Sequence, residues 1–433
     1  MTKDNKKIGL ALSGGGYRAA AYHIGTLKAL HNLGVLEKID VISSISGGSI
    51  TAAYYALHKD NYKEFEEKMI TKLRTGVLWA TILILSVEGC GLLVLQCWLL
   101  SVLLDADICI GWKVCVSIVL NIIVLALILF LLHKVVPTSC LIERMYRCKF
   151  FGNKTLSDFP EKPILAINAT DVEQNQHLTF SQFKVASGKK YPKTYFQHKQ
   201  IPISLAVMAS SAYPMFSPVS IPREYLTDEN SLSPILVDGG IYDNHGAHKL
   251  GEEKSAYHAD YIIVSEAGNT LMNRKGTWNI GSLLFKVIDM MMNRIEKLQR
   301  RFNEYRTDNA NQRYAYVALT WRADENYVGR FVENIKRGYV PLDLCKCHGI
   351  VEPLFLQIQN GDVAALEQAK QLVEKSIGWD VLYANRPKEN VWNKAVGVST
   401  GLFGLSKKEI ESLIAVAEWM TKVQVLTYFK NLL

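Results

Sequence analysis

The sequence predicts an α/β fold, because three apolar or β-branched runs each lead into a glycine-rich turn. The runs cover residues 8–12, 41–42 and 235–237, and each has the pattern of a short buried strand. The turns are Gly14-Gly15-Gly16, Ser46-Gly47-Gly48 and Asp238-Gly239-Gly240. Helix patterns follow the first two turns, so strands and helices alternate along this part of the chain.

The second turn has the features of a nucleophile elbow. A nucleophilic serine must project its hydroxyl clear of the backbone, and a sharp strand-to-helix turn with small neighbours achieves this. Gly47 places a backbone N–H at the helix start, where the helix dipole favours negative charge. Gly48 is expected to let the chain pass close to the adjacent helix, and Ser44 stands where the motif usually has glycine. The alternative is a tight Gly-Gly turn with a capping serine.

The first turn has the composition of an anion-binding loop. Three consecutive glycines after a strand expose several N–H groups with no side chains in the way, and such a nest at a helix start binds phosphate or an oxyanion. Arg18, one turn into the next helix, is expected to brace the loop or add positive potential.

A dinucleotide-binding fingerprint is the alternative for this loop. Residues 14–19 fit G-x-G-x-x-G with alanine in the last place, and Asp40 lies near the distance of a ribose-binding acid. However, Asp40 precedes the second strand instead of ending it, and this interpretation gives Ser46-Gly47-Gly48 no role. The pattern therefore favours an oxyanion loop.

The third turn supplies a candidate base. A carboxylate at a strand end, followed by glycines that allow close approach, can take the proton of a serine hydroxyl. In isolation, Asp238-Gly239 also fits a simple turn. His245 and His248 follow within ten residues and are the alternatives for a Ser-His-Asp triad, although histidines at this spacing are more often surface or capping residues.

Taken in order, the three turns resemble those of the patatin-like phospholipase family. Residues 6–12 and 39–46 look like the family's first two strands, and residues 209–216 look like its small-residue helix end and proline loop. The resemblance covers residues 6–75 and 160–270, and it implies a three-layer α/β/α hydrolase.

The resemblance also implies a Ser–Asp dyad without a histidine. Carried over by position, Ser46 is the nucleophile and Asp238 is the base. The N–H groups of Gly14, Gly15 and Gly16 form the oxyanion hole, while Arg18, Gly47, Gly48, Gly239 and Gly240 support the two turns. Ala19 replaces a frequent glycine of the family. The scheme requires no cofactor and no metal.

Two long apolar runs interrupt the family-like sequence. Residues 77–104 contain one charge, Glu88, and residues 114–132 contain Ser117 and Asn121 as their clear polar breaks. Each run is long enough to cross a bilayer as a helix, so we expect a transmembrane helical hairpin within residues 76–134. The alternative is a buried core hairpin of a soluble fold.

The charges around this hairpin predict its orientation. Lys68, Lys72 and Arg74 precede the first run, and His133 and Lys134 follow the second. Basic flanks remain in the cytoplasm. The expected protein is therefore an integral membrane protein with its catalytic domain on the cytoplasmic side.

The hairpin divides the expected hydrolase into residues 1–75 and 135–275, and residues 276–433 form an α+β extension. Within the extension, the patterns predict a strand at 313–321 and helices at 363–377 and 407–429. Ser406 and Glu409 fit a capping box for the last helix. An earlier helix carries an apolar face that we expect to pack on a core, and a membrane-surface role is the less favoured alternative for it. That face comprises Leu284, Ile288, Met291, Ile295, Leu298 and Phe302.

The net charge and the cysteine content indicate which kinds of partner and which bonds we expect of this protein. The net charge of +8 fits attraction to anionic lipid headgroups, and no basic run with an aromatic platform indicates nucleic acid. The eight cysteines are scattered and form no disulfide framework. Cys345-Lys346-Cys347-His348 lacks a second ligand pair, so we expect it to be structural. Homo-oligomer formation is left open.

The sequence therefore predicts a membrane-anchored serine lipid acyl hydrolase of the phospholipase A type, with a membrane phospholipid or another acyl lipid as substrate. Two alternatives from other classes remain. One is a catalytically silent membrane scaffold of the same fold, and the other is a nucleotide-binding membrane enzyme that uses Gly14-Gly15-Gly16.

Overall fold

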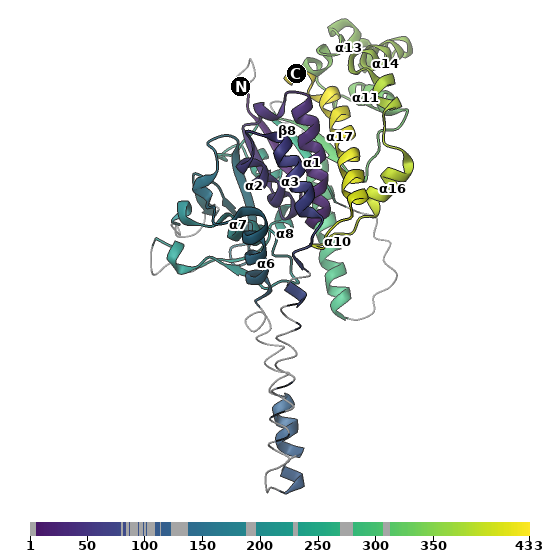
Figure 1. Ribbon diagram of the computed structural model, residues 1–433. Coiled ribbons are helices and arrows are strands. Elements are labelled where there is room, and N and C mark those ends of the chain that lie inside the picture. Colours follow the sequence, from purple (N-terminus) through teal and green to yellow (C-terminus); the bar gives the residue numbers. More distant parts are fainter. Residues whose placement is uncertain are drawn as a thin grey trace.

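The computed structural model describes most of the chain (Figure 1). The described residues are 6–78, 81–83, 86, 94, 98, 101, 109–112, 114–122, 137–187, 196–227, 233–268, 280–305 and 312–433. The strands are β1 (Ile8–Leu12), β2 (Val41–Ser44), β3 (Ile164–Asp171), β4 (Gln176–Phe180), β5 (Val185–Ser187), β6 (Val219–Ser220), β7 (Ile235–Asp238), β8 (Tyr261–Glu266) and β9 (Arg313–Ala318).

Helices precede, follow and connect these strands. In the first 275 residues they are α1 (Gly16–Asn32), α2 (Gly47–Leu57), α3 (Tyr62–Leu73), α6 (Thr138–Tyr146), α7 (Ile203–Ser210), α8 (Gly240–Asp243) and α9 (His248–Gly251). Further on they are α10 (Ile280–Tyr305), α11 (Tyr327–Lys336), α12 (Leu342–Lys346), α13 (Glu352–Gln359), α14 (Val363–Ile377), α15 (Trp379–Ala384), α16 (Glu389–Gly397) and α17 (Lys407–Tyr428).

Within the described residues, nine strands form one mixed sheet. Its main path has the order β5-β4-β3-β2-β1-β8-β9, and β7 pairs with β3 and with β6. The five strands from β3 to β9 along this path run parallel, whereas β4, β5, β6 and β7 pair antiparallel. The carboxyl ends of β1 and β2 therefore lie side by side, with Leu12 paired to Ser44.

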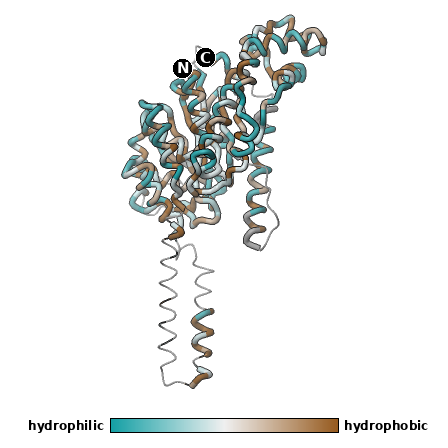
Figure 2. The backbone as a smooth tube through the Cα atoms, turned by 45° about the vertical axis from the view of Figure 1, so that its right-hand side comes forward, coloured by the Kyte–Doolittle hydropathy of each residue, from teal (hydrophilic) through white to brown (hydrophobic). Residues whose placement is uncertain are grey.

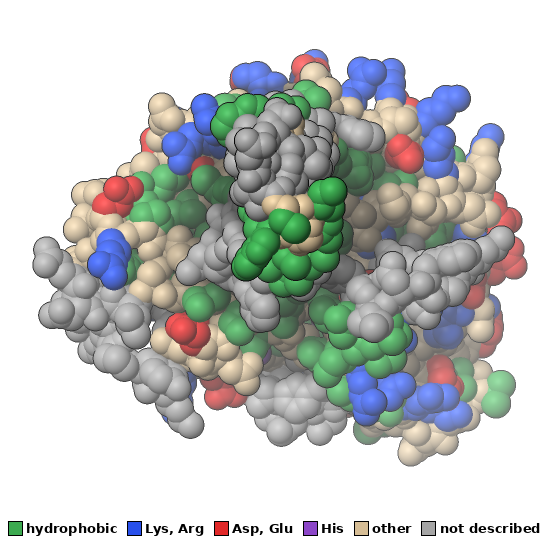
Figure 3. All heavy atoms as spheres, turned by 90° about the horizontal axis from the view of Figure 1, so that it is seen from below, with side chains coloured by type: hydrophobic (Ala, Val, Ile, Leu, Met, Phe, Trp, Pro, Cys, Tyr) green, Lys and Arg blue, Asp and Glu red, His purple; other side chains and the backbone are tan. Residues whose placement is uncertain are grey.

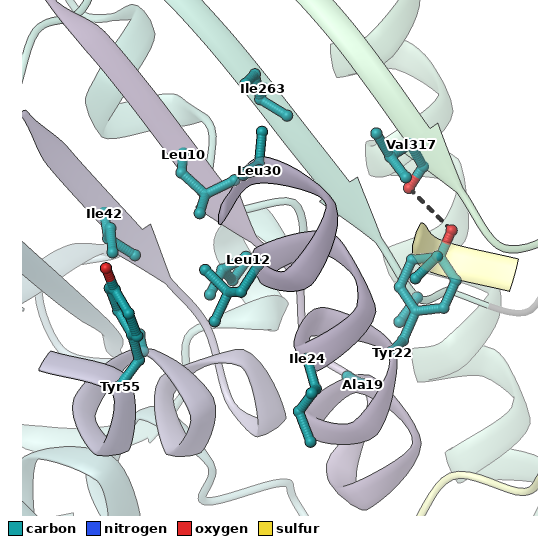
Figure 4. Packing of buried hydrophobic residues seen from close by; sticks show 14 of the residues in the cluster. Leu10, Leu12, Ala19, Tyr22, Ile24, Leu30, Ile42, Tyr55, Ile263 and Val317 are labelled. Carbon is teal, nitrogen blue, oxygen red and sulfur yellow. Dashed lines mark hydrogen bonds between the residues drawn. The ribbon is translucent and has the colours of Figure 1, made fainter. Parts of the chain in front are cut away.

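Alternate side chains of the parallel strands enter two cores. Leu10, Ile42 and Ile263 are register neighbours on three strands; Leu10 and Ile263 lie beside Leu30 of α1, and Ile42 lies beside Tyr55 of α2 (Figure 4). On the opposite face, Ala11 and Val264 belong to a smaller core that the short helix α9 and the loop after it cover. This two-sided burial explains why the strands are continuous apolar runs. The α/β fold predicted from the sequence is confirmed, with a mixed sheet and a helical C-terminal part.

The C-terminal residues complete the sheet and its helical layer. The strand β9 pairs in parallel with β8, and α17 packs along α1 (Figure 1). A Cβ added at Gly25 of α1 would lie 2.3 Å from the Ile414 carbonyl oxygen and 2.8 Å from Ala417 Cβ. Glycine is therefore what allows the two helices to approach this closely. Residues 276–433, expected as an extension, contribute directly to the core around α1.

Several predicted elements of this region are confirmed. The helix α14 covers the predicted residues 363–377, and α17 begins after Ser406, whose side chain and that of Glu409 form the predicted capping box. The strand predicted at 313–321 is β9. Cys345 is buried, and His348 hydrogen bonds to Ser376 and to the Thr427 carbonyl, contacts that fit the expected structural role of this segment.

The expectation that the apolar face of α10 packs on a core is wrong for half of that face. Leu284, Met291 and Leu298 are exposed, whereas Ile288 and Ile295 are half-buried. The side chain of Phe302 lies outside the described residues. The helix turns a second, more polar stripe toward the protein, which the periodicity of its apolar residues did not indicate.

No helix in the described part of the chain combines the length and the apolar character needed to cross a bilayer. Both predicted spans, 77–104 and 114–132, fall largely on residues outside the described set. The described residues 110–112 and 114–122 are strongly hydrophobic (Figure 2), and Ile110, Trp112, Val114 and Ile122 are more than half exposed.

The close approach of α1 and α17 predicts a specific loss of stability. Replacing Gly25 with alanine forces the helices apart and should lower the free energy of unfolding by about 1–3 kcal/mol. Gly397→Ala is the matched control, because nothing lies within 4 Å of a Cβ at that position. Chemical denaturation of both variants in one detergent measures the difference, and equal midpoints would contradict this account of the packing.

Candidate active site

The first two glycine turns meet at the carboxyl ends of β1 and β2. A Cβ added at Gly47 would lie 2.0 Å from the Gly16 carbonyl oxygen, and one at Gly48 would lie 2.4 Å from that of Leu12. Gly48 therefore permits close approach to the end of β1, and not to an adjacent helix as the sequence suggested. Any side chain at these two positions would separate the turns.

Ser46 occupies the strained position of its turn. Its φ is 49°, a conformation that non-glycine residues rarely adopt and that costs on the order of 1–3 kcal/mol. Ser46 immediately precedes α2, and its N–H donates to Ser210 Oγ at 2.9 Å. The side chain is 8% exposed. This geometry matches the nucleophile elbow predicted from the sequence.

Asp238 is the last residue of β7, and hydrogen bonds fix both its backbone groups and its carboxylate. Its N–H donates to the Ala212 carbonyl at 2.8 Å, and its own carbonyl accepts a hydrogen bond from Thr170 Oγ1 at 2.9 Å. The Gly240 N–H donates to the carboxylate at 2.7 Å. Burial raises the pKa of Asp238 to about 6, and the hydrogen bonds from Gly240 and the Ser46 side chain oppose that rise. Ser46 and Asp238, 192 residues apart in the chain, are thus brought together.

The three glycine N–H groups are not equivalent. The N–H of Gly14 donates to the Asn244 carbonyl at 3.0 Å, so it is already engaged. In the described part of the chain, the N–H groups of Gly15, Gly16 and Gly47 have no hydrogen-bond acceptor. The expectation that Gly14 donates to an oxyanion is therefore corrected, and Gly15, Gly16 and Gly47 are the available donors.

The surroundings of these donors favour an anion. Both α1 and α2 begin at this site, and neither carries an acidic residue in its first turn, so their dipoles are not offset there. Arg18 is 4% exposed, and its Nη1 donates to the Val398 carbonyl at 3.3 Å. Its Nη2 would lie 3.3 Å from a Cβ at Gly15. Arg18 thus lies against the glycine loop, as expected. Burial lowers its pKa to about 10, partly offset by Glu296, so it remains charged at neutral pH.

The histidines considered for a triad have other partners. The backbone N–H of His248 donates to Asp243 Oδ2 at 2.8 Å, and its ring packs against those of His177 and Tyr242. His245 is 1% exposed, and its Nε2 lies 3.4 Å from Glu266 Oε2, so the expected surface or capping position is wrong for it. In the described residues, no histidine hydrogen bonds to Ser46 or Asp238. The geometry therefore favours a two-residue arrangement.

His245, Glu266 and Glu296 form a buried charged cluster beside the site. Their potential ligand atoms lie within 4.8 Å of one another, which makes them the candidate metal-binding group among the described residues. Arg300 Nη1 also lies 3.5 Å from Glu266 Oε2. Burial lowers the pKa of His245, but the adjacent Glu266 carboxylate, with smaller effects of Glu296 and Asp243, raises it to about 9. His245 and Arg300 thus both lie beside the Glu266 carboxylate, whereas burial raises the pKa of Glu296.

Asp40 lies at the opposite edge of the sheet from the glycine loop. Its Oδ2 accepts the N–H of Ile8, the first residue of β1, and its Oδ1 accepts from Lys162. A dinucleotide fingerprint places its acid at the carboxyl end of the second strand, next to the glycines. This position argues against the nucleotide-binding alternative.

Three residues that position the site had no assigned role in the sequence. Ser210 ends α7, accepts the Ser46 N–H and shares a hydrogen bond of 2.9 Å with Ser49. Asn244 accepts the Gly14 N–H, and Thr170 holds the Asp238 carbonyl. The small-residue segment 209–216 stood out in the sequence, but nothing local indicated that its serine reaches Ser46.

The chain is similar to known proteins in sequence and in fold. The sequence model of the family described as patatin-like phospholipase matches residues 10–250, which is more than half of the 433 residues. The matched range contains all three glycine turns.

Individual relatives are more distant. A stretch of 49 residues, 11% of this chain, is 45% identical to the Saccharomyces cerevisiae protein described as "Putative meiotic phospholipase SPO1", of which it covers 8%. Human GIVD cytosolic phospholipase A2 is similar at a TM-score of 0.45 and 11% identity, over 99% of this chain and 60% of that one. VipD from Legionella pneumophila is similar at a TM-score of 0.32 and 13% identity, over 97% and 92%. The chain thus spans less than two thirds of the length of the first two.

The contact between Ser210 and Ser46 predicts a loss of serine reactivity. Ser210→Ala removes the acceptor of the Ser46 N–H, and an unsatisfied buried N–H costs about 1–3 kcal/mol, so the strained turn should relax. We expect labelling of Ser46 by a fluorophosphonate to slow by about tenfold or more. Ser211→Ala is the control, because Ser211 is also buried but hydrogen bonds to Tyr146, Val207 and Met208 and not to the turn. Equal labelling rates would assign Ser210 no positioning role.

Proposed function

The chain belongs to the patatin-like phospholipase family, and on that premise we propose that it hydrolyses acyl esters of membrane lipids through Ser46 and Asp238. The observation that carries this proposal is the position of a buried carboxylate beside a strained serine at a helix start. A serine so placed can attack an ester carbonyl once its proton is taken.

The reaction proceeds by acyl transfer. The Asp238 carboxylate takes the hydroxyl proton while Ser46 Oγ bonds to the ester carbonyl carbon, and the carbonyl oxygen becomes an oxyanion. The N–H groups of Gly15, Gly16 and Gly47 stabilise that charge, aided by two helix N-termini. The intermediate collapses as the C–O bond breaks, and the leaving alcohol receives the proton from Asp238.

Water completes the cycle. Asp238 accepts a proton from a water molecule, whose oxygen attacks the acyl-serine carbonyl. Collapse of this second intermediate releases the fatty acid and returns the proton to Ser46. The raised pKa of Asp238 suits this exchange, because a base whose pKa lies near the working pH both accepts and returns protons efficiently.

Membrane anchoring by the two apolar runs, 77–104 and 114–132, is part of the proposal. The exposure of the hydrophobic side chains of residues 110–122 supports it. The segments on either side of the insertion are also joined, since Lys72 donates to the carbonyl of Lys149, which follows α6, and Lys149 donates to the carbonyl of Thr75. An insertion with adjacent ends leaves the catalytic fold intact. We propose that the catalytic domain lies on the cytoplasmic side, as the basic flanks predict.

Ser46→Ala tests the nucleophile. With a phospholipid that carries two distinguishable labelled acyl chains, we expect wild-type protein in liposomes to release fatty acid. The variant should lose at least about a thousandfold in rate, as removal of a catalytic serine does. The chain released gives the position of cleavage.

Two outcomes would overturn this assignment. Equal release by both proteins would remove Ser46 as the nucleophile. Absence of both release and fluorophosphonate labelling, in protein with an unchanged unfolding midpoint, would support the silent scaffold.

The pKa of Asp238 predicts the pH dependence. The carboxylate must be ionised to accept the proton, so kcat/KM should fall as pH decreases, with a midpoint near 6.

Because the pKa of Asp238 in the folded state is above the ordinary value of an aspartate, the folded state binds this proton more tightly than the unfolded state does. This group therefore makes the protein more stable as pH falls through the window from about 6 to about 4. Unfolding through Asp238 thus does not account for the loss of activity. A pH–rate profile tests this, and a midpoint that persists in Asp238→Asn would contradict it.

A further inference from the structure

The outer face of α10 is an exposed apolar stripe. Leu284, Met290 and Met291 are 58%, 61% and 58% exposed. Leu283, Val287 and Leu298 lie on the same side of the helix and are also exposed. A soluble surface rarely leaves so many large apolar side chains together without a partner.

Basic side chains accompany this stripe, whereas the acidic side chains that the structure describes in α10, Asp289 and Glu296, face the protein. Arg294, Lys297 and Arg301 are exposed, and Lys286 is half-exposed one turn before Met290. Asp289 accepts a hydrogen bond from Tyr213, and Glu296 accepts one from Asn244. The outer face of the helix is therefore apolar and cationic, which is the composition of a helix that lies against an anionic lipid surface.

The position of α10 agrees with such a surface. Figures 1 and 2 show the helix extending beyond the body of the protein on the side to which residues 110–122 also extend. Seen from that side, hydrophobic side chains gather in groups with lysines and arginines beside them (Figure 3). An apolar and cationic helix on the side of the exposed segment 110–122 can reach the same bilayer.

We propose that the outer face of α10 docks on an anionic lipid bilayer. Its apolar stripe enters the boundary of headgroups and acyl chains, and its four basic side chains contact the headgroups. A second copy of the chain fits this face poorly, because it would present the same positive charges to them.

The face of α10 that is turned toward the protein contacts the residues around the Asp238 turn. A Cβ at Gly240 would lie 3.1 Å from Met292 Cε, and the Asn244–Glu296 hydrogen bond measures 2.5 Å. Tyr213, which follows the residue that accepts the Asp238 N–H, donates to Asp289 at 2.8 Å. The inner face of α10 thus contacts both sides of the Asp238 turn, so a docked helix holds that turn beside the bilayer. This consequence rests on the proposed function, whereas docking itself does not.

Photocrosslinking in vesicles tests docking without catalysis. The photocrosslinker p-benzoylphenylalanine replaces Leu284 in the full chain, reconstituted in vesicles of phosphatidylcholine and phosphatidylserine. We expect lipid adducts at position 284 and none at position 363, an 80% exposed valine in α14 on the opposite side of the molecule (Figure 1). Absence of lipid adducts at 284, or covalent dimers formed through it, would overturn the proposal. Position 118 tests the membrane anchor separately.

An activity comparison tests the consequence for the site. Leu284→Glu combined with Met291→Glu should lower hydrolysis of vesicle lipid by about tenfold or more, since both side chains leave the bilayer. Hydrolysis of a short-chain soluble ester should remain unchanged, and Val363→Glu should affect neither substrate. An equal loss on both substrates would mean that the outer face acts through folding and not through docking. Failure of wild-type protein on both substrates would instead contradict the proposed function.

Discussion

The contact between the two glycine turns is the constraint on which the site depends. Parallel pairing of β1 with β2 places their carboxyl ends side by side, and each strand then turns into a helix. The space between the turns accommodates no side chain at Gly47, because its Cβ would overlap the Gly16 carbonyl oxygen. This contact brings two helix N-termini to the strained serine, with N–H groups that have no acceptor among the described residues. Without it, neither the serine nor the N–H groups would form a site.

Burial sets the pKa of the Asp238 carboxyl group. Asp238 is 4% exposed, and removal from water raises its pKa, while the Gly240 N–H and the Ser46 hydroxyl stabilise the charged form. Desolvation is the larger effect, and the result is a carboxyl group suited to proton exchange near neutral pH. The antiparallel strand β7 supplies this group from the opposite direction, which is why the turn that follows it can face the turn after β2.

Sequence-distant segments hold the site in place. The Ser46 N–H depends on Ser210, 164 residues away, and the Tyr17 N–H donates to the carbonyl of Gly401 near the C-terminal end. The helix α10 contacts the Asp238 turn with its inner face and leaves an apolar, cationic outer face. The inner face of α10 thus belongs to the site, and its outer face belongs to the exposed surface of the protein. The two faces differ in composition because one contacts protein and the other does not.

The sequence by itself determined the α/β class, the three turns and the residue types that carry the chemistry. It could do so because glycine runs, strand patterns and capping residues such as Ser406 act over a few neighbouring positions. Only the tertiary structure decided that Asn244 engages the Gly14 N–H, that His245 is buried beside Glu266, and that half of the apolar face of α10 is exposed. Each of these depends on which sequence-distant segment packs against a given hydrogen-bonding group or helix face. The local periodicity of the sequence does not determine that contact, because it is set by the packing of the whole chain.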